Sequence, residues 1–140
     1  RIGKRAKLYM NDSGMMASIL KWQHDTVRLD EQKLGKLVET LIYNEIAAHV
    51  SCQTDYQLYH YRDREQREID LLVERDDGAL LGIEVKAGSM IKRDHFKHLE
   101  WFRNHLLKVN QDFTGIILYT GEKAIPFAED LWAIPMGFLL

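Results

Sequence analysis

The sequence predicts an α/β fold in which a helix is followed by three strands, a second helix and a further strand. Residues 68–86 alternate apolar and polar side chains on either side of a turn, which is typical of a hairpin. Residues 31–50 and 91–108 have apolar residues at helical spacing. Residues 113–121 are almost continuously apolar, as expected for a strand that is covered on both faces.

The chain is expected to consist of an N-terminal extension and one globular domain. Residues 1–30 are predicted to form a small strand and helix that pack on a single globular unit, residues 31–140. Residues 5–10 read as the strand, and residues 11–13 offer capping side chains for a helix through residues 14–20. Because the chain begins at Arg1, we expect it to be part of a longer protein.

The long helix over residues 31–50 is apolar over a wide arc, which predicts burial on more than one side. Its polar sector holds Lys36, Thr40 and Asn44. Glu39 and Glu45 both fall within the apolar arc. Because a buried carboxylate needs a partner or a metal ion, each is a candidate site residue. Each could instead pair with an arginine or with an aromatic hydroxyl or N–H, so the helical wheel alone does not choose.

A three-residue loop, Asp76 to Gly78, gives the hairpin a register that matches its apolar faces. This register sets Leu71 against Ile83 and Ile69 against Val85. The predicted apolar faces are Ile69, Leu71 and Val73 on the first strand and Leu81, Ile83 and Val85 on the second.

The same register places the carboxylates of Asp70 and Glu84 opposite each other. Like charges in this position destabilise a sheet, so a cation between them is expected, and Mg²⁺ suits carboxylates, water and phosphate oxygens. Lys86 on the same face could orient or activate a water or stabilise negative charge. Alternatively this face is simply solvated, with Glu68 and Lys86 forming an ordinary cross-strand ion pair.

The remaining elements follow in order. Residues 57–61 are predicted to form a strand, residues 62–67 a charged turn, and the last ten residues a partly extended segment interrupted at Pro135. His95 and His98 in the second helix could share a zinc ion, but no HExxH pattern accompanies them and a solvated face explains them as well. Core positions of that helix are expected at Ile91, Phe96, Leu99, Phe102, Leu106 and Val109.

Composition bounds the function. With 46% hydrophobic and 29% charged residues, the chain resembles an ordinary globular protein. A net charge of −2 excludes a global basic field, so nucleic-acid binding would need a local basic patch. The single cysteine, Cys52, excludes an internal disulfide and fits a reducing cytoplasm, and there is neither a secretory signal nor an apolar run that could span a membrane.

Asp70, the triplet Glu84-Val85-Lys86 and a helical Glu39, in this order of elements, resemble the PD-(D/E)XK nuclease superfamily. The resemblance implies a restriction-endonuclease-like three-layer core, with a central mixed sheet flanked by helices. It also implies that Asp70, Glu84, Glu39 and the Val85 carbonyl bind Mg²⁺ or Mn²⁺, and that Lys86 assists the attacking water. The Glu68-Ile69-Asp70 sequence departs from the usual Pro-Asp of this superfamily.

The chain also resembles the uncharacterised domain at the C-terminal end of many bacterial and archaeal AAA+-type ATPases. The matching motifs are Lys7-Leu8-Tyr9, Ser13-Gly14, Gly35 to Glu39, Asn44-Glu45, Tyr61-Arg62-Asp63, Glu68-Ile69-Asp70 and Glu84-Val85-Lys86. The likeness implies an ATPase domain upstream, since no P-loop sequence occurs here.

Two functions from different classes follow. The first is a metal-dependent endonuclease or exonuclease domain that hydrolyses phosphodiester bonds of nucleic acid. The second is a non-catalytic recognition or regulatory module that binds nucleic acid or a protein partner for the ATPase. A purely structural oligomerisation domain is a third hypothesis. The sequence assigns no oligomeric state and does not choose between DNA and RNA.

Overall fold

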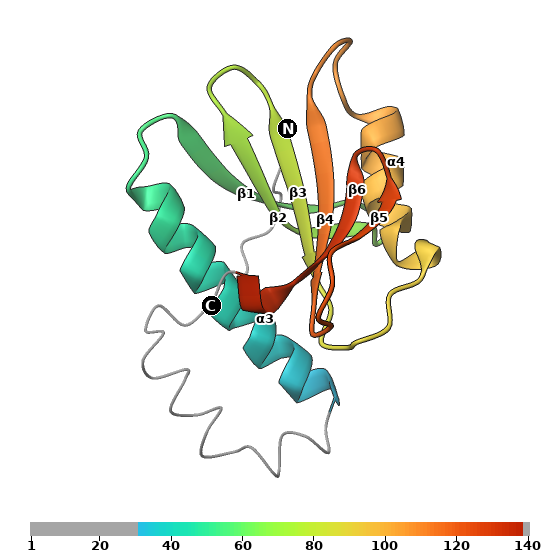
Figure 1. The fold of residues 1–140 in the computed structure, drawn as a ribbon. Coiled ribbons are helices and arrows are strands. Elements are labelled where there is room, and N and C mark those ends of the chain that lie inside the picture. Colours follow the sequence, from blue (N-terminus) through green and yellow to red (C-terminus); the bar gives the residue numbers. More distant parts are fainter. Residues whose placement is uncertain (1–30, 139–140) are drawn as a thin grey trace.

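The structure is a computed structural model that describes residues 31–138, with the backbone alone for residues 31–37 (Figure 1). The strand and helix predicted for residues 5–10 and 14–20, and with them the proposed N-terminal unit of residues 1–30, lie outside the described residues. The elements are α3 (Glu31–Ser51), β1 (Tyr56–Arg62), β2 (Glu68–Arg75), β3 (Leu80–Val85), the 3₁₀ helix η1 (Arg93–Phe96), α4 (Lys97–His105), β4 (Phe113–Tyr119), β5 (Ile125–Ala128), β6 (Leu131–Pro135) and the 3₁₀ helix η2 (Met136–Phe138).

The strands described here form one mixed sheet with the order β1-β2-β3-β4-β6-β5. β1, β2 and β3 are antiparallel neighbours, β3, β4 and β6 run parallel, and β5 returns antiparallel to β6. The predicted α/β class is confirmed. β5 was not predicted; it contains Pro126 and lies at the edge of the sheet, where a proline is tolerated.

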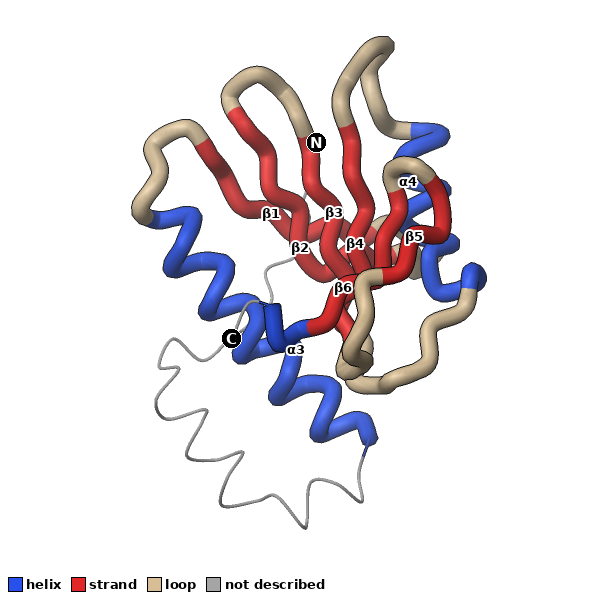
Figure 2. The backbone as a smooth tube through the Cα atoms, viewed as in Figure 1, coloured by secondary structure: helices blue, strands red, loops and turns tan. Residues whose placement is uncertain are grey.

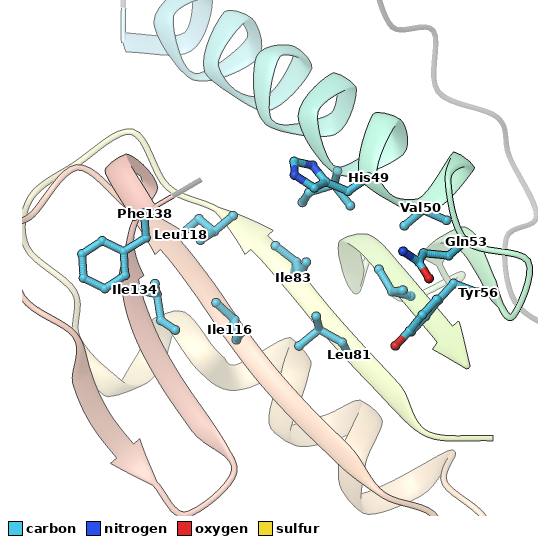
Figure 3. A pocket seen from close by; sticks show the side chains of 12 residues that line it. His49, Val50, Gln53, Tyr56, Leu81, Ile83, Ile116, Leu118, Ile134 and Phe138 are labelled. Carbon is cyan, nitrogen blue, oxygen red and sulfur yellow. The ribbon is translucent and has the colours of Figure 1, made fainter. Parts of the chain in front are cut away.

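α3 lies across one face of the sheet, against β1 and β3 (Figure 1). Its side chains Ile42 and Ile46 meet a buried cluster contributed by the strands and η2 (Figure 3 shows part of this face). Thr40 is only 5% exposed, although the sequence placed it in a polar sector of the helix. The strand and η2 members of the cluster are Leu71, Val73, Ile83, Leu118 and Met136.

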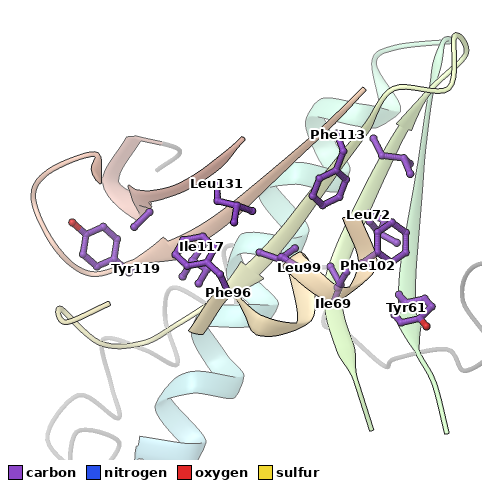
Figure 4. Close-up of a cluster of buried hydrophobic side chains, with 12 residues drawn as sticks. Tyr61, Ile69, Leu72, Phe96, Leu99, Phe102, Phe113, Ile117, Tyr119 and Leu131 are labelled. Atoms are coloured by element: carbon purple, nitrogen blue, oxygen red, sulfur yellow. The ribbon is translucent and has the colours of Figure 1, made fainter. Parts of the chain in front are cut away.

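η1 and α4 cover the opposite face, where Phe96, Leu99 and Phe102 are fully buried (Figure 4). Phe102 packs edge-on against Tyr61 with ring centroids 5.3 Å apart. The sheet therefore has an apolar cluster on each side, as expected for a layered α/β domain. Strand residues in this second cluster include Ile69, Leu72, Leu80, Phe113, Ile117, Tyr119, Leu131 and Ala133.

The second helix is shorter than predicted. It starts as a 3₁₀ turn at Arg93, and α4 ends at His105. Leu106 and Val109, expected in the core, are 44% and 91% exposed. The helix was predicted to run to residue 108 because apolar residues continue at helical spacing beyond His105. Apolar spacing alone does not show where a helix ends.

The predicted hairpin loop is confirmed. The Arg75 N–H donates to the Ala79 carbonyl (2.9 Å), and Gly78 has φ +91°, a conformation that favours glycine. The Arg75 guanidinium donates to the Asp77 carboxylate at 2.9 and 2.6 Å and lowers its pKa to about 2. Leu71 faces Ile83 as expected, and the β2–β3 pairs continue to Glu74 opposite Leu80.

A β-bulge interrupts β2 just before this paired stretch. On β1, Tyr59 and Tyr61 are two positions apart, but their partners on β2 are Leu72 and Ile69, which are three apart. The additional residue lies between Ile69 and Leu72, in the segment that contains Asp70. Bulges reorient side chains and are frequent next to functional sites.

One predicted apolar face and three predicted cross-strand pairs were wrong at this end of the hairpin. Ile69 belongs to the cluster under α4, whereas Leu71 belongs to the cluster under α3, so the two do not share a face. The β2–β3 pairs end at Leu71 opposite Ile83, so the expected pairing of Ile69 with Val85 does not form. Here the Val85 N–H donates to an Asp70 carboxylate oxygen instead. The predicted pairs of Asp70 with Glu84 and of Glu68 with Lys86 likewise lie beyond the last paired residues.

Candidate functional site

A polar cavity of about 590 Å³ opens where β2 and β3 part. The long loop from the end of β3 to η1 starts at this end of the sheet (Figure 2). The five site residues that the nuclease resemblance implies line the cavity, although they come from α3, β2, β3 and the residue after β3. The lining residues are Glu39, Gln66, Glu68, Asp70, Glu84, Val85, Lys86, Asp94, His95, Lys97, His98 and Ile117.

Asp70 is fixed by the irregular end of β2. Its Oδ2 accepts a hydrogen bond from the Val85 N–H at 2.8 Å. The side chain thus takes up a backbone donor that a regular ladder would have paired with the main chain, and it links the ends of the two strands. The half-buried carboxylate is held within the cavity by this contact.

Glu84 lies on β3 beside Ile117 of the parallel neighbour β4. Its side chain is 20% exposed, and its Oε1 lies 4.0 Å from Nδ1 of His98 on α4. The same Nδ1 lies 3.3 Å from the Glu68 N–H nitrogen and 3.2 Å from the Glu68 carbonyl oxygen. His98 therefore joins α4 to the start of β2, with its ring near the carboxylate of Glu84.

The sequence did not reveal this role of His98, which was weighed as half of a zinc pair or as part of a solvated helix face. The available signal was its position four residues before Phe102, which puts both residues on one side of the helix. The signal was weak, because only the docking of α4 brings His98 to Glu84.

His95 has a structural role at the start of η1. Its Nδ1 accepts a hydrogen bond from the Lys92 N–H at 2.9 Å. Burial lowers the pKa of His95 below its ordinary value, and the positive charges of Lys86 and Lys92 lower it further against the opposing effect of Asp94. The neutral ring is thereby favoured next to a lysine that faces the same cavity.

Of the two candidate acids of α3, only one lines the cavity. Glu39 lines it, whereas Glu45 is not among the lining residues. Lys86 is exposed, and its backbone N–H donates to the Leu118 carbonyl at 2.8 Å, which fixes the chain just after β3. Glu39 from the helix layer and Lys86 from the end of the sheet therefore border the same space as Asp70.

The donor groups around the cavity determine which metal ions it could suit. Within residues 31–138, as far as side chains are described, no group of three or more His, Cys, Asp or Glu side chains could hold a metal ion together. The described residues therefore offer no zinc site built from several protein ligands. Mg²⁺ is commonly bound by one or two carboxylates with several waters, and Asp70 and Glu84 at the neighbouring strand ends fit this donor chemistry.

The fold and the cavity define an α/β domain with a carboxylate-lined site at the end of its central strands. Residues 34–139 match the family described as Domain of unknown function (DUF4143), and the chain belongs to this family. The family is often found with AAA ATPases. No curated protein and no solved structure matches the chain. In the described part of the chain, no helix has the length and apolar character needed to cross a membrane.

Proposed function

We propose that this domain is a Mg²⁺-dependent or Mn²⁺-dependent nuclease that hydrolyses phosphodiester bonds of nucleic acid. The observation that carries the proposal is the convergence of Glu39, Asp70, Glu84, Val85 and Lys86 on one cavity. These residues come from α3, β2, β3 and the residue after β3. The residue pattern makes Glu39, Asp70, Glu84 and Lys86 candidates, and the superfamily resemblance adds Val85. Acidic and basic side chains together suit a reaction in which a metal-bound phosphate ester gains negative charge.

The residues around the cavity divide the work of metal binding and catalysis. Asp70 and Glu84 hold the metal ion, Glu39 completes or supports the site, and the Val85 carbonyl is a further ligand. When bound, the ion supplies Lewis-acid chemistry and lowers the pKa of a water ligand. Lys86 orients the attacking water and stabilises the negative charge that develops on the phosphoryl oxygens.

We further propose that the core is restriction-endonuclease-like. What supports this is the order of α3, three antiparallel strands, α4 and a parallel fourth strand, with the helices on opposite faces. The location of Asp70 and Glu84 on adjacent central strands supports it as well. As in the AAA+-associated domains that the sequence resembles, an upstream ATPase domain would be its partner within a longer chain.

A second candidate is a non-catalytic recognition or regulatory module of such an ATPase, which binds nucleic acid or a protein. The observation in its favour is that no three ligating side chains are grouped within the described residues. The Asp70 carboxylate also has a structural role, because it accepts the Val85 N–H. The two candidates differ in whether the cavity binds a divalent ion and turns over a substrate.

Asp70→Asn separates these functions from folding. The amide oxygen can still accept the Val85 N–H, so the strand ends should stay linked while the charge for the metal is lost. We expect calorimetry to show Mg²⁺ or Mn²⁺ binding to the parent chain and not to the variant, and DNA or RNA cleavage to disappear with it. Glu129→Gln, which removes an exposed acid away from the cavity, is the matched control.

The outcomes discriminate between the candidates. Binding and cleavage that are lost in Asp70→Asn but retained in Glu129→Gln support the nuclease. Cleavage that persists in Asp70→Asn would place the activity elsewhere. Absence of metal binding at millimolar Mg²⁺ and Mn²⁺ would reject the nuclease for this chain and leave the recognition module.

A further inference from the structure

A second cavity, of about 520 Å³, lies between the C-terminal half of α3 and the sheet (Figure 3). Its floor is formed by side chains of β2, β3, β4 and β6, and its rim by α3, Gln53, Tyr56 and Phe138. The lining is almost wholly apolar, and His49 is its one histidine. The lining residues are Ile46, His49, Val50, Gln53, Tyr56, Val73, Leu81, Ile83, Ile116, Leu118, Ile134 and Phe138.

This groove lies over the parallel part of the sheet. On the α4 side, Ile117 and Leu131 are fully buried, whereas on the groove side Ile116 and Ile134 are only partly covered. At its rim, Phe138 is 67% exposed. Parallel strands are normally covered on both faces, and apolar patches left open mark sites of contact. The groove side of β4 and β6 therefore calls for a covering apolar segment.

The chain contains a segment with matching chemistry. Residues 14–20 carry no charge and are apolar except for Ser18 and Gly14, as the groove requires. In a helix, Met15 with Ile19 and Met16 with Leu20 are four residues apart and form one stripe. Methionine side chains adapt well to an irregular apolar surface.

The connection to the core is long enough. Residues 21–30 join this segment to the start of α3 at Glu31 and can span roughly 33 Å when extended. From Glu31 to Ile46, where α3 borders the groove, the helix rises roughly 22 Å. The segment can thus run back along α3 to the groove.

We propose that residues 14–20 dock as a helix in this groove and complete the cover of β4 and β6. The occupant is a segment of the same chain, and the docking is independent of any nuclease activity. The docked stripe of Met15, Met16, Ile19 and Leu20 faces Ile116 and Ile134.

Photo-cross-linking of the full 140-residue chain tests the docking. A benzophenone amino acid in place of His49, an exposed residue at the groove rim, should cross-link to the tryptic peptide of residues 8–21. Mixing isotope-labelled and unlabelled protein distinguishes links within one chain from links between copies. The same probe at Lys123, which is exposed outside the groove, should give no such link.

Two variants with the same added charge complete the test. Ile19→Glu places a carboxylate in the docking stripe and should abolish the link, whereas Thr26→Glu lies outside the stripe and should preserve it. Links found only between labelled and unlabelled chains would assign the groove to a second copy and overturn the proposal. A link that survives Ile19→Glu, or no link to residues 8–21, would overturn it equally.

Discussion

Tyr61 shows how burial and one neighbouring carboxylate act on a single side chain. The residue is 8% exposed, and its hydroxyl donates to Oδ2 of Asp63 at 3.1 Å. Burial, the hydrogen bond to Asp63 and the negative charge of that carboxylate raise the pKa of Tyr61 to about 12. Oδ2 of Asp63 also forms an ion pair with Nη1 of Arg67 at 2.9 Å. This ion pair closes the charged turn before β2.

Tyr61→Phe should therefore change how stability depends on pH. A tyrosine whose pKa is higher in the folded state stabilises the fold fully below pH 10.0, and this contribution falls as pH rises from 10.0 towards about 12. The variant should lack that part of the alkaline loss. Below pH 10.0 it should cost about 0.5–1.5 kcal/mol for the lost hydrogen bond.

Urea unfolding of both proteins across this pH range measures the effect. Because the other groups titrate alike in both proteins, the difference between them isolates Tyr61. Parallel stability curves above pH 10.0 would contradict the assignment. Tyrosinate absorbance provides a second check, since the late-titrating tyrosine should disappear in the variant.

Lys86→Met tests the separation of binding from chemistry in the proposed site. The lysine is exposed at the cavity. Because its side chain is positively charged, it is not a ligand of the proposed metal ion. Its loss should lower kcat about 100-fold or more, since a group that stabilises developing charge is removed. Metal affinity should stay equal or rise, because a positive charge leaves the cavity.

Single-turnover cleavage and calorimetry on Lys86→Met provide the two readouts. Lys123→Met, a lysine outside the cavity, is the control and should match the parent chain in both. Loss of metal binding together with cleavage would show that Lys86 supports the site structurally rather than the reaction.

The sequence predicted most residues of the candidate site, but not the contacts that position them. Asp70, Glu84 and Lys86 were predicted from local sequence, by the alternation of the two strands and by a hairpin register. That register holds from Glu74 opposite Leu80 to Leu71 opposite Ile83 and stops before Asp70, so the predicted pairing of Asp70 with Glu84 was wrong. The contact of Asp70 with the Val85 N–H was not predictable, because the bulge that produces it depends on the pairing of β2 with β1. His98 was missed for a similar reason, since its neighbour Glu84 is distant in the sequence.

At the level of elements, two glycines let α4 lie close to the sheet. Gly82 of β3 and Gly115 of β4 are directly paired beneath Leu99. A Cβ at Gly82 would lie 2.8 Å from Leu99 Cδ2, and one at Gly115 would lie 2.7 Å from Leu131 Cδ2. Both leucines are fully buried, so neither can move into solvent to make room.

Gly82→Ala should destabilise the fold by about 1–3 kcal/mol through overpacking. Leu99→Ala alone should cost about 2–5 kcal/mol, because it opens a cavity. In the double variant the alanine methyl at position 82 would occupy part of that cavity, so the combined cost should be less than the sum.

Chemical denaturation of the two single variants and the double variant measures this coupling. Gly88→Ala is the matched control, since a Cβ added there would have no atom within 4 Å, and it should change stability by less than about 0.5 kcal/mol. If the losses of unfolding free energy at positions 82 and 99 simply add, Leu99 does not limit the side-chain size at position 82.

Elements with local signals were predicted well. The Asp-Asp-Gly loop determined the hairpin register, and the long periodic stretch predicted α3 almost to its ends. β5 was missed because it has only four residues and pairs with β6 alone. The end of α4 was misplaced because exposed Leu106 and Val109 continue the apolar pattern beyond the helix.

At the scale of the whole molecule, the candidate site draws on every layer. Glu39 comes from α3, Asp70 and Glu84 from the sheet, and His98 from α4. The clusters on the two sheet faces hold these layers together. Binding at the cavity must therefore be linked to the stability of the entire fold, since the unfolded chain cannot bring these residues together.

Mg²⁺ or Mn²⁺ should accordingly raise the unfolding temperature of the parent chain. At 100 times the dissociation constant, a ligand specific for the folded state contributes about 2.7 kcal/mol. Glu84→Gln should lose this increment because a carboxylate of the proposed metal pair is neutralised, whereas Lys86→Met should retain it. Thermal unfolding followed by circular dichroism, with NaCl added to equal ionic strength, separates specific binding from screening.

The sign of the result in metal-free buffer adds a second test. Asp70 and Glu84 lie in one cavity, so their charges repel without a cation, and Glu84→Gln should leave the metal-free protein equally or more stable. A variant that is more stable without metal but gains nothing from it would show that the carboxylates are kept for binding. If Glu84→Gln instead destabilised the metal-free protein and still responded to Mg²⁺, the carboxylate would serve the fold, for example through His98 at 4.0 Å, and the metal would bind elsewhere.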